Sequence, residues 1–302
     1  MSSTENSKNT IDTYEFYGTY KGHTTKNLEK VLSSVKSESK PIAYLVGDSS
    51  FDNKFWFGKI KDTCNHAAFN GYENVLDPPL SVPDIAYWIN HAVAHHPDKT
   101  CVCINAAIEE STLTDREMDL LEQDKFVRDN IQPNDYLVVS VGGNDIALKP
   151  STSTILNMAG LIYSPMFAIN NGYAPGMSYF KTMFSTKISE YITKLVSKTK
   201  PRAVIVCMIY YPDETDSDSW ASNVLNKLGY NSNPKKLQHI IKKIYTDALS
   251  KIKICGTTVV PYPLFTVLDG KTTADYEQRV EPSISGGAKI GYALANEINM
   301  IG

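Results

Sequence analysis

The fold of this 302-residue chain is decided by the stretch PIAYLVGDSS, residues 41–50. A continuous apolar run, Ile42 to Val46, is followed directly by a glycine and then by polar side chains. A short apolar run that ends in a turn signal is typical of a strand buried on both faces. We therefore expect residues 42–46 to form an inner strand of a sheet, with Gly47, Asp48 and Ser49 at its carboxyl end.

Four further apolar runs of strand length predict four more strands, over residues 101–108, 136–141, 203–210 and 257–262. Segments with apolar residues at three-to-four spacing predict the intervening helices, over residues 82–95, 115–131, 179–196 and 234–252, with a last helix over 285–298. This alternation predicts an α/β domain over residues 41–302, with a five-stranded parallel sheet between two helix layers. Residues 1–40 are rich in Ser, Thr, Asn and Lys, and we expect a polar, mobile arm there.

Composition excludes several classes of partner. Lys and Arg total 30 against 33 Asp and Glu, so the net charge of -3 does not favour binding to nucleic acid or to an anionic membrane. We expect no membrane span, because no apolar stretch reaches about 18 residues. The start of the sequence lacks the features of a secretory signal, and the five cysteines contain no CxxC pair. We expect a cytoplasmic protein with buried, reduced thiols, and with Cys101 and Cys103 on one face of a strand.

Two long segments, residues 149–176 and 212–233, follow the third and fourth predicted strands. Both are rich in Gly, Pro, Ser and Tyr, and loops longer than about 15 residues in a compact domain are usually functional. Ligands of open α/β sheets bind beyond the carboxyl ends of the strands. We expect these insertions to form the walls of a pocket at that edge.

Polar residues stand at three of the predicted strand ends. They are Gly47-Asp48-Ser49-Ser50 after the first strand, Asn105 to Thr112 around the end of the second, and Gly142-Gly143-Asn144-Asp145 after the third. Together these segments resemble the conserved blocks of the GDSL or SGNH hydrolase family. The resemblance implies a flavodoxin-like three-layer α/β/α fold, with Ser49 as the nucleophile and the Asn144 amide as a donor to the oxyanion.

The second and fifth blocks of that family are matched only in part. Asn105, Ala106 and Thr112 fit the second block, but Glu110 stands where the oxyanion glycine is expected. In the fifth block Pro282 and Gly286 fit, whereas Gln278 occupies the position of the triad aspartate and Glu281 that of the histidine.

These replacements lead to specific expectations. A serine hydroxyl needs a base within hydrogen-bond reach, and Glu281 is the best available one if burial and neighbouring carboxylates raise its pKa. His66 is an alternative imidazole. The backbone N–H of Glu110 can still serve the oxyanion hole, and we expect its carboxylate to turn away or to pair with a cation such as Arg279. A carboxylate cluster of Asp48, Glu110 and Glu281 is predicted near Ser49, where it shifts its own pKa values, binds a cation, or attracts a positively charged substrate group.

We predict an atypical serine esterase or acyl hydrolase that acts on the ester or acetyl group of a small molecule through Ser49. Asp48, Ser50, Gly143 and Arg279 are expected to contact the substrate, and no cofactor or metal is required. The alternative is an impaired relative that binds a small-molecule, carbohydrate or lipid ligand without cleaving it. The sequence lacks the D-x-H and G-H-x-H segments of the two-metal phosphoesterases and the GxGxxG of dinucleotide sites, which argues against both.

Overall fold

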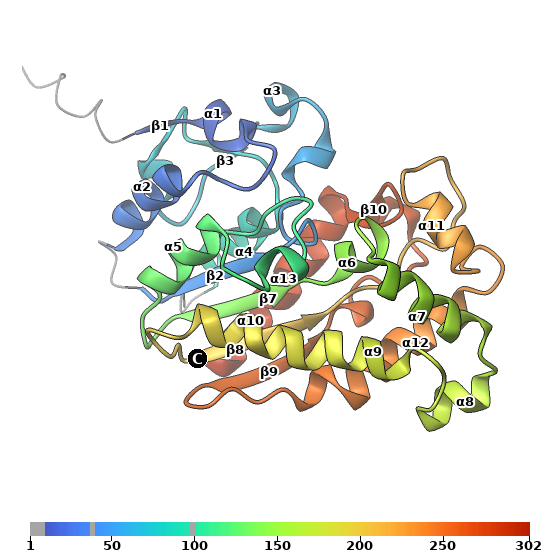
Figure 1. The fold of residues 1–302 in the computed structure, drawn as a ribbon. Coiled ribbons are helices and arrows are strands. Elements are labelled where there is room, and N and C mark those ends of the chain that lie inside the picture. The colour runs from blue at the N-terminus through green and yellow to red at the C-terminus, as the bar shows by residue number, and fades with distance from the viewer. Residues whose placement is uncertain (1–9, 37–39, 97–100) are drawn as a thin grey trace, which may run out of the picture.

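The computed structural model describes residues 10–36, 40–96 and 101–302 (Figure 1). Its centre is a five-stranded parallel sheet with the order β6-β2-β7-β8-β9. The strands are β2 (Ile42–Gly47), β6 (Val102–Asn105), β7 (Tyr136–Ser140), β8 (Ala203–Met208) and β9 (Thr258–Pro263). All five predicted strands are confirmed, and their order is that of flavodoxin-like sheets.

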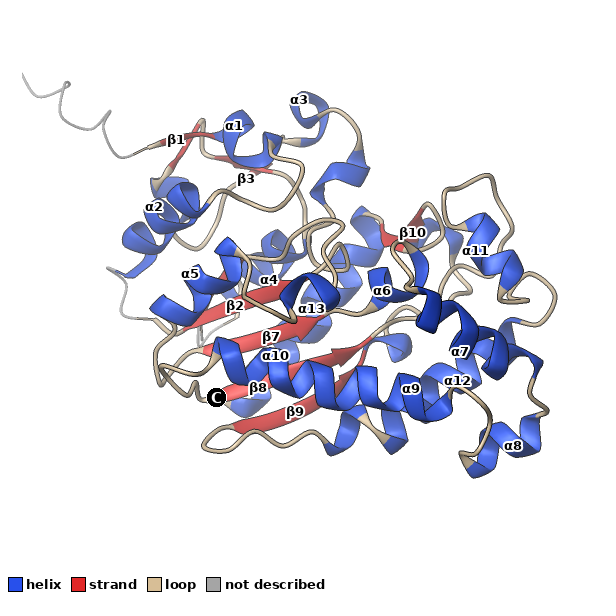
Figure 2. Ribbon diagram, in the orientation of Figure 1, coloured by secondary structure: helices blue, strands red, loops and turns tan. Residues whose placement is uncertain are grey.

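Helices cover both faces of the sheet (Figure 2). One layer contains α2 (Thr25–Val35), α5 (Glu122–Asn130), α10 (Ile188–Leu195) and α12 (Pro234–Asp247), and the other contains α4 (Ile85–Ala94) and α13 (Ile284–Ile301). Alternate residues of β2 face opposite layers: Tyr44 and Val46 pack into the first core, Ala43 and Leu45 into the second. The three-layer α/β/α architecture follows from strands that are apolar on both faces.

Two of the predicted helices are interrupted. The segment 115–131 contains a 3₁₀ turn, Thr114–Arg116, and then α5, while the segment 179–196 is formed by α9 (Met177–Thr182), a π-helical turn (Met183–Lys187) and α10. The helix predicted over 234–252 ends at Asp247 and is followed by a 3₁₀ turn, Leu249–Lys251. Helical periodicity located these elements, but it does not report where the hydrogen-bond pattern changes.

Residues 10–36 form regular secondary structure, whereas a mobile arm was expected over residues 1–40. Residues 10–36 contain β1 (Ile11–Asp12), α1 (Thr13–Gly18) and α2. The apolar side chains of α2 recur at Leu28, Val31, Leu32 and Val35, and all four are buried in the first core. This amphipathic stripe docks the segment against the domain. Residues 1–9 and 37–39 of the predicted arm lie outside the described residues.

The first insertion is largely helical, whereas the second is mostly loop and contains one short helix. The first contains α7 (Thr152–Tyr163) and α8 (Met166–Asn171), and the second contains α11 (Ser222–Lys227). Both follow the carboxyl ends of their strands, on the right in Figure 1. Shorter elements complete the chain: α3 (Ile60–Thr63), β3 (His66–Ala67), β4 (Leu76–Asp77), β5 (Leu80–Ser81), α6 (Gly143–Ala147), β10 (Tyr276–Glu277) and β11 (Glu281–Pro282).

Cys101 and Cys103 belong to the same core cluster, as predicted, and Cys64 and Cys207 are buried as well. Cys255 is exposed, so the expectation of buried thiols does not hold for it. Within the described residues, no helix has the length and apolar character needed to cross a bilayer.

Candidate active site

Ser49 lies just beyond the carboxyl end of β2, after a turn that only glycine accommodates. Gly47 has φ of +129°, and a Cβ atom at this position would lie 1.7 Å from the carbonyl oxygen of Ser140 on β7. The backbone N–H of Asp48 donates to the same oxygen at 3.1 Å. The close approach of β2 to β7 therefore directs the chain out of the sheet at the residue before Ser49.

Hydrogen bonds of the Asp48 side chain connect the loop after β2 to the loop after β7. Its buried carboxylate accepts hydrogen bonds from the hydroxyl of Ser50 at 2.6 Å, from the N–H of Ser50 at 3.1 Å and from the N–H of Gly142 at 3.2 Å. Burial raises the pKa of Asp48, and the two bonds from Ser50 oppose that rise. Asp48, Ser50 and Gly143 line the same cavity as Ser49, but the polar groups of Asp48 and Ser50 are used to hold the loop.

Asn144, on the short helix α6, also lines this cavity. Its side-chain amide donates to the carbonyl oxygen of Ser111 at 3.1 Å, which holds the amide at the sheet edge. Within residues 10–36, 40–96 and 101–302, neither the backbone N–H of Ser49 nor that of Glu110 has an acceptor. The backbone N–H groups of Ser49 and Glu110 are thus available as donors, and Ser49 lines the same cavity as the Asn144 amide.

The side chain of Glu110 points away from this group. Glu110 has φ of +59°, and its carboxylate accepts from the hydroxyl of Tyr20 at 3.0 Å and pairs with Lys21 at 3.1 Å. These two partners lower the pKa of Glu110. Glu110 does pair with a cation, as one of the two expectations has it, but the cation is Lys21 and not Arg279. Glu110 does not belong to the predicted carboxylate cluster.

Glu281 lies beside Ser49, at the position that the fifth-block pattern indicated. It belongs to β11, which pairs antiparallel with β10, and its side chain is buried. Burial raises the pKa of Glu281, and the carboxylates of Asp48 and Asp52 raise it further, whereas a hydrogen bond with the Ser49 hydroxyl lowers it. Its Oε2 atom has no hydrogen-bond partner within the part of the chain that the structure describes. A carboxyl group that is reluctant to ionise is thus in contact with the serine.

Glu109, which the sequence analysis missed, is the second buried carboxyl group of the site. Burial raises the pKa of Glu109, and the nearby charges of Glu281, Asp52 and Asp48 raise it further. The backbone N–H of Glu109 donates to Asp52 at 2.8 Å, and Asp52 also accepts from Gly22 at 2.7 Å. The carboxyl cluster near Ser49 therefore consists of Asp48, Asp52, Glu109 and Glu281.

Lys54 is the cation of this cluster, since its buried ammonium pairs with Asp52. Sequence spacing alone did not identify the pair, although Asp52 and Lys54 follow Ser49 closely. Among the described residues, no group of three or more His, Cys, Asp or Glu side chains has the arrangement of a metal site.

Gln278 and Arg279 form the turn between β10 and β11, with φ of +48° and +68°. Gln278 accepts a hydrogen bond from the N–H of Trp220 at 3.1 Å, and buried Arg279 pairs with Asp216 at 3.0 Å. Arg279 also donates to the carbonyl of Asp213 at 3.1 Å. Neither residue lines the cavity, so the expected substrate contact of Arg279 is not observed; both instead anchor the second insertion.

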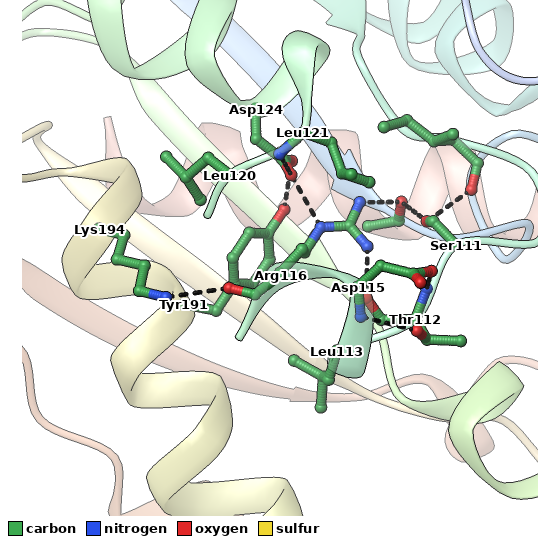
Figure 3. Close-up of polar contacts among 12 residues, drawn as sticks. Ser111, Thr112, Leu113, Asp115, Arg116, Leu120, Leu121, Asp124, Tyr191 and Lys194 are labelled. Atoms are coloured by element: carbon green, nitrogen blue, oxygen red, sulfur yellow. Dashed lines mark hydrogen bonds and ion pairs between the residues drawn. The ribbon is translucent and has the colours of Figure 1, made fainter. Parts of the chain in front are cut away.

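A second buried ion pair, between Arg116 and Asp124, lies near the carboxyl end of β2 (Figure 3). Arg116 pairs with Asp124 at 2.8 Å, and Asp124 also accepts from the hydroxyl of Tyr191 at 2.6 Å. The guanidinium donates to the carbonyl of Gly47 at 3.0 Å and to that of Thr112 at 2.9 Å. Arg116 therefore links the residue two before Ser49 to the loop that carries Glu109 and Glu110.

No histidine lines the cavity at Ser49 within the described residues. The ring of His66 contacts Tyr87 and Trp88, and His23 is stacked on Phe16 with a centroid distance of 3.9 Å. Burial lowers the pKa of His23 to about 3. None of the residues that line the cavity at Ser49 is a histidine, so His66 does not supply the imidazole considered as an alternative.

The cavity at Ser49 has a volume of about 130 Å³. Its polar lining consists mainly of Asp48, Ser49, Ser50, Asn144 and Glu281. Apolar side chains from both insertions, β8 and α12 make up most of the remainder, including Leu161, Met208, Leu225 and Ile241. The insertions thus form pocket walls.

Comparison with known proteins gives structural similarity only: no family model matches this chain, and no curated protein does. Axe2, an acetyl xylan esterase from Geobacillus stearothermophilus, is similar with 15% identity and a TM-score of 0.44, over 85% of this chain and 94% of that one. Est24, a carbohydrate acetylesterase from Sinorhizobium meliloti, is similar with 12% identity and a TM-score of 0.44, over 87% and 100%. LAE5, an alpha/beta hydrolase enzyme from the metagenome of Lake Arreo, Spain, has 11% identity and a TM-score of 0.42, over 87% and 96%. At such low identity, the function of this chain has to be argued from its own residues.

Proposed function

We propose that this protein is a serine esterase of the SGNH type in which Ser49 is the nucleophile and Glu281 the general base. The observation that carries the proposal is the contact of the Ser49 hydroxyl with a buried carboxyl group whose pKa is raised. A base is most effective when its pKa lies near the working pH, and an ordinary glutamate, with a pKa near about 4.3, is a weak one. Burial beside other carboxylates therefore turns Glu281 into a useful proton acceptor.

In the first step the Ser49 oxygen attacks the ester carbonyl carbon, and its proton moves to Glu281. The tetrahedral oxyanion is held by the N–H groups of Ser49 and Glu110 and by the Asn144 amide. The intermediate collapses when the C–O bond to the alcohol breaks, and Glu281 returns its proton to the leaving oxygen. An acyl group remains on Ser49.

In the second step Glu281 removes a proton from water, which attacks the acyl carbon. The acyl C–O bond to Ser49 then breaks, Glu281 gives its proton to the Ser49 oxygen, and the acid leaves. Glu109 assists by keeping a proton on the pair of buried carboxyls, because two adjacent carboxylates are costly to ionise together. The reaction requires no cofactor. The substrate is a small-molecule ester, and the buried free thiols favour a reducing, cytoplasmic setting.

The proposal is tested by comparing the protein with Ser49→Ala and with Ser178→Ala, a control on the exposed surface of α9. We expect turnover of p-nitrophenyl esters and labelling by a fluorophosphonate probe in the wild type and the control, and neither in Ser49→Ala. If the wild type shows neither signal between about pH 6 and 9, the esterase proposal is wrong, and a protein that binds its ligand without cleavage is the better description.

A further inference from the structure

The cavity beside Ser49 is larger and more apolar than an acetyl group needs. Its walls include Leu161 of the first insertion, Phe184 of the π-helical turn, Met208 of β8, Leu225 of the second insertion and Ile241 of α12. These five side chains are buried, with at most 4% of their surface exposed. An apolar wall offers water few hydrogen-bond partners, so this partly open cavity favours hydrocarbon.

The size of the cavity limits what it can hold. Apolar cavities of about 150 Å³ accommodate a benzene molecule. The cavity at Ser49, with about 130 Å³, therefore holds a chain of about five or six carbon atoms. An acetyl group would leave most of this space empty.

The reaction sequence indicates which part of the ester lies there. The alcohol leaves in the first step and has to reach solvent, whereas the acyl group stays bonded to Ser49 until water attacks. A buried cavity that begins at Ser49 therefore suits the acyl group.

We propose, on the basis of the serine-esterase function above, that the substrate carries a medium-length alkyl acyl chain, near hexanoyl, which occupies the cavity between α7, α11 and α12. Helix α7 carries apolar residues on both sides: Met158 and Ile162 line the cavity, whereas Leu156 is 68% exposed on the opposite side of the helix. The inner residues select the chain length, and Leu156 offers a matched control.

The experiment measures kcat/KM for p-nitrophenyl esters from acetate to dodecanoate and, separately, for alkyl acetates of increasing alcohol length. Each methylene added to the acyl chain is expected to raise kcat/KM by about two- to fourfold, up to a chain of about six carbons. For longer acyl chains we expect kcat/KM to fall. The alkyl acetates should show no comparable rise.

Filling the cavity should remove this preference. In Met158→Trp or Ile162→Trp we expect the hexanoate-to-acetate ratio of kcat/KM to drop by at least about tenfold. The control Leu156→Trp, on the outer surface of the same helix, should keep the wild-type ratio. Circular dichroism and melting temperatures show whether the filled variants are folded, and a folded variant that keeps the wild-type ratio contradicts the assignment.

The outcomes separate this inference from the proposed function. Ser49-dependent turnover that is fastest for acetate, or that rises only with alcohol length, overturns the acyl-chain assignment and leaves the esterase intact. If no Ser49-dependent turnover is found, calorimetry with Ser49→Ala and p-nitrophenyl hexanoate or acetate decides the question. Binding of hexanoate at least about tenfold tighter than acetate, lost in Ser49→Ala/Ile162→Trp, supports the cavity assignment, and equal binding overturns it.

Discussion

The Ser49 hydroxyl lies close enough to the Glu281 carboxyl group to lower the pKa of that carboxyl, although the two residues come from opposite ends of the chain. Ser49 follows the inner strand β2, and Glu281 precedes α13, whose N-cap is Ser283. Helix α13 packs tightly on α4, since a Cβ atom on Gly291 would lie 2.5 Å from the Cβ of Trp88. Packing of the last helix therefore sets the distance between the proposed nucleophile and its base.

Replacement of Glu281 by glutamine should lower kcat by about 10²–10⁴-fold, because the amide cannot take the proton of Ser49. The matched control is Glu277→Gln, in the hairpin position that pairs with Glu281 across β10 and β11. Glu277 does not line the cavity, so its variant should keep wild-type activity. Steady-state kinetics on both variants, with melting curves to verify folding, make the comparison; equal activities would refute the role of Glu281.

The pH profile of kcat/KM should have its acidic limb near neutrality. Only ionised Glu281 can accept a proton, and burial raises its pKa above the ordinary glutamate value, so activity falls as the pH drops through the raised pKa. In Glu109→Gln the limb should stay in place, because Glu109 keeps its proton and is uncharged while Glu281 ionises. A limb at about pH 4, in either protein, would mean that Glu281 titrates as an ordinary glutamate.

Removal of the Asn144 amide should lower kcat by about 10²–10³-fold with little change in KM, as expected for a donor that acts on the oxyanion. Asn171→Ala is the control, because this exposed asparagine also donates to a backbone carbonyl, that of Phe167, but lies outside the cavity lining. Each variant loses one such bond, so stability should change by only about 1 kcal/mol in both. Similar kinetics for the two variants would exclude Asn144 from the oxyanion hole.

Arg116→Met should destabilise the protein by about 3–5 kcal/mol, because it leaves the Asp124 carboxylate buried without its cation. It should also reduce activity, since the carbonyl of Gly47 loses the donor that holds the turn before Ser49. The double variant Arg116→Met/Asp124→Leu should recover part of the stability but not the activity. Urea unfolding and kinetics on Arg116→Met, Asp124→Leu and the double variant test this separation, and additive losses of stability would contradict the coupling.

Much of the site could be predicted from local sequence. Ser49 and Asn144 follow apolar runs that had to be buried strands, and the carboxyl ends of neighbouring parallel strands meet at one edge. Glu281 was located because the frame around it, with Pro282 and Gly286, opens the last helix. In these cases a position in the chain implies a position in the fold.

Glu109 could not be predicted in this way. Glu109 and Glu110 are adjacent, and the left-handed backbone at Glu110 lets one side chain enter the site while the other pairs with Lys21. The partners that stabilise this arrangement, Gly22 and Lys21, come from the segment that composition predicted to be a mobile arm. Composition measures average polarity and therefore missed the narrow apolar stripe of α2 that holds the segment in place.

By itself, the sequence determined the order of strands and helices, the two-sided burial of the sheet and the presence of a serine, an amide and a glutamate at its carboxyl edge. Periodic burial of apolar side chains is a local property, and it can be inferred from spacing. Only the tertiary structure decided which carboxyl groups face Ser49, how burial raises their pKa values and how large the adjoining cavity is. These properties depend on side chains that meet from distant segments, and no local pattern in the chain records such meetings.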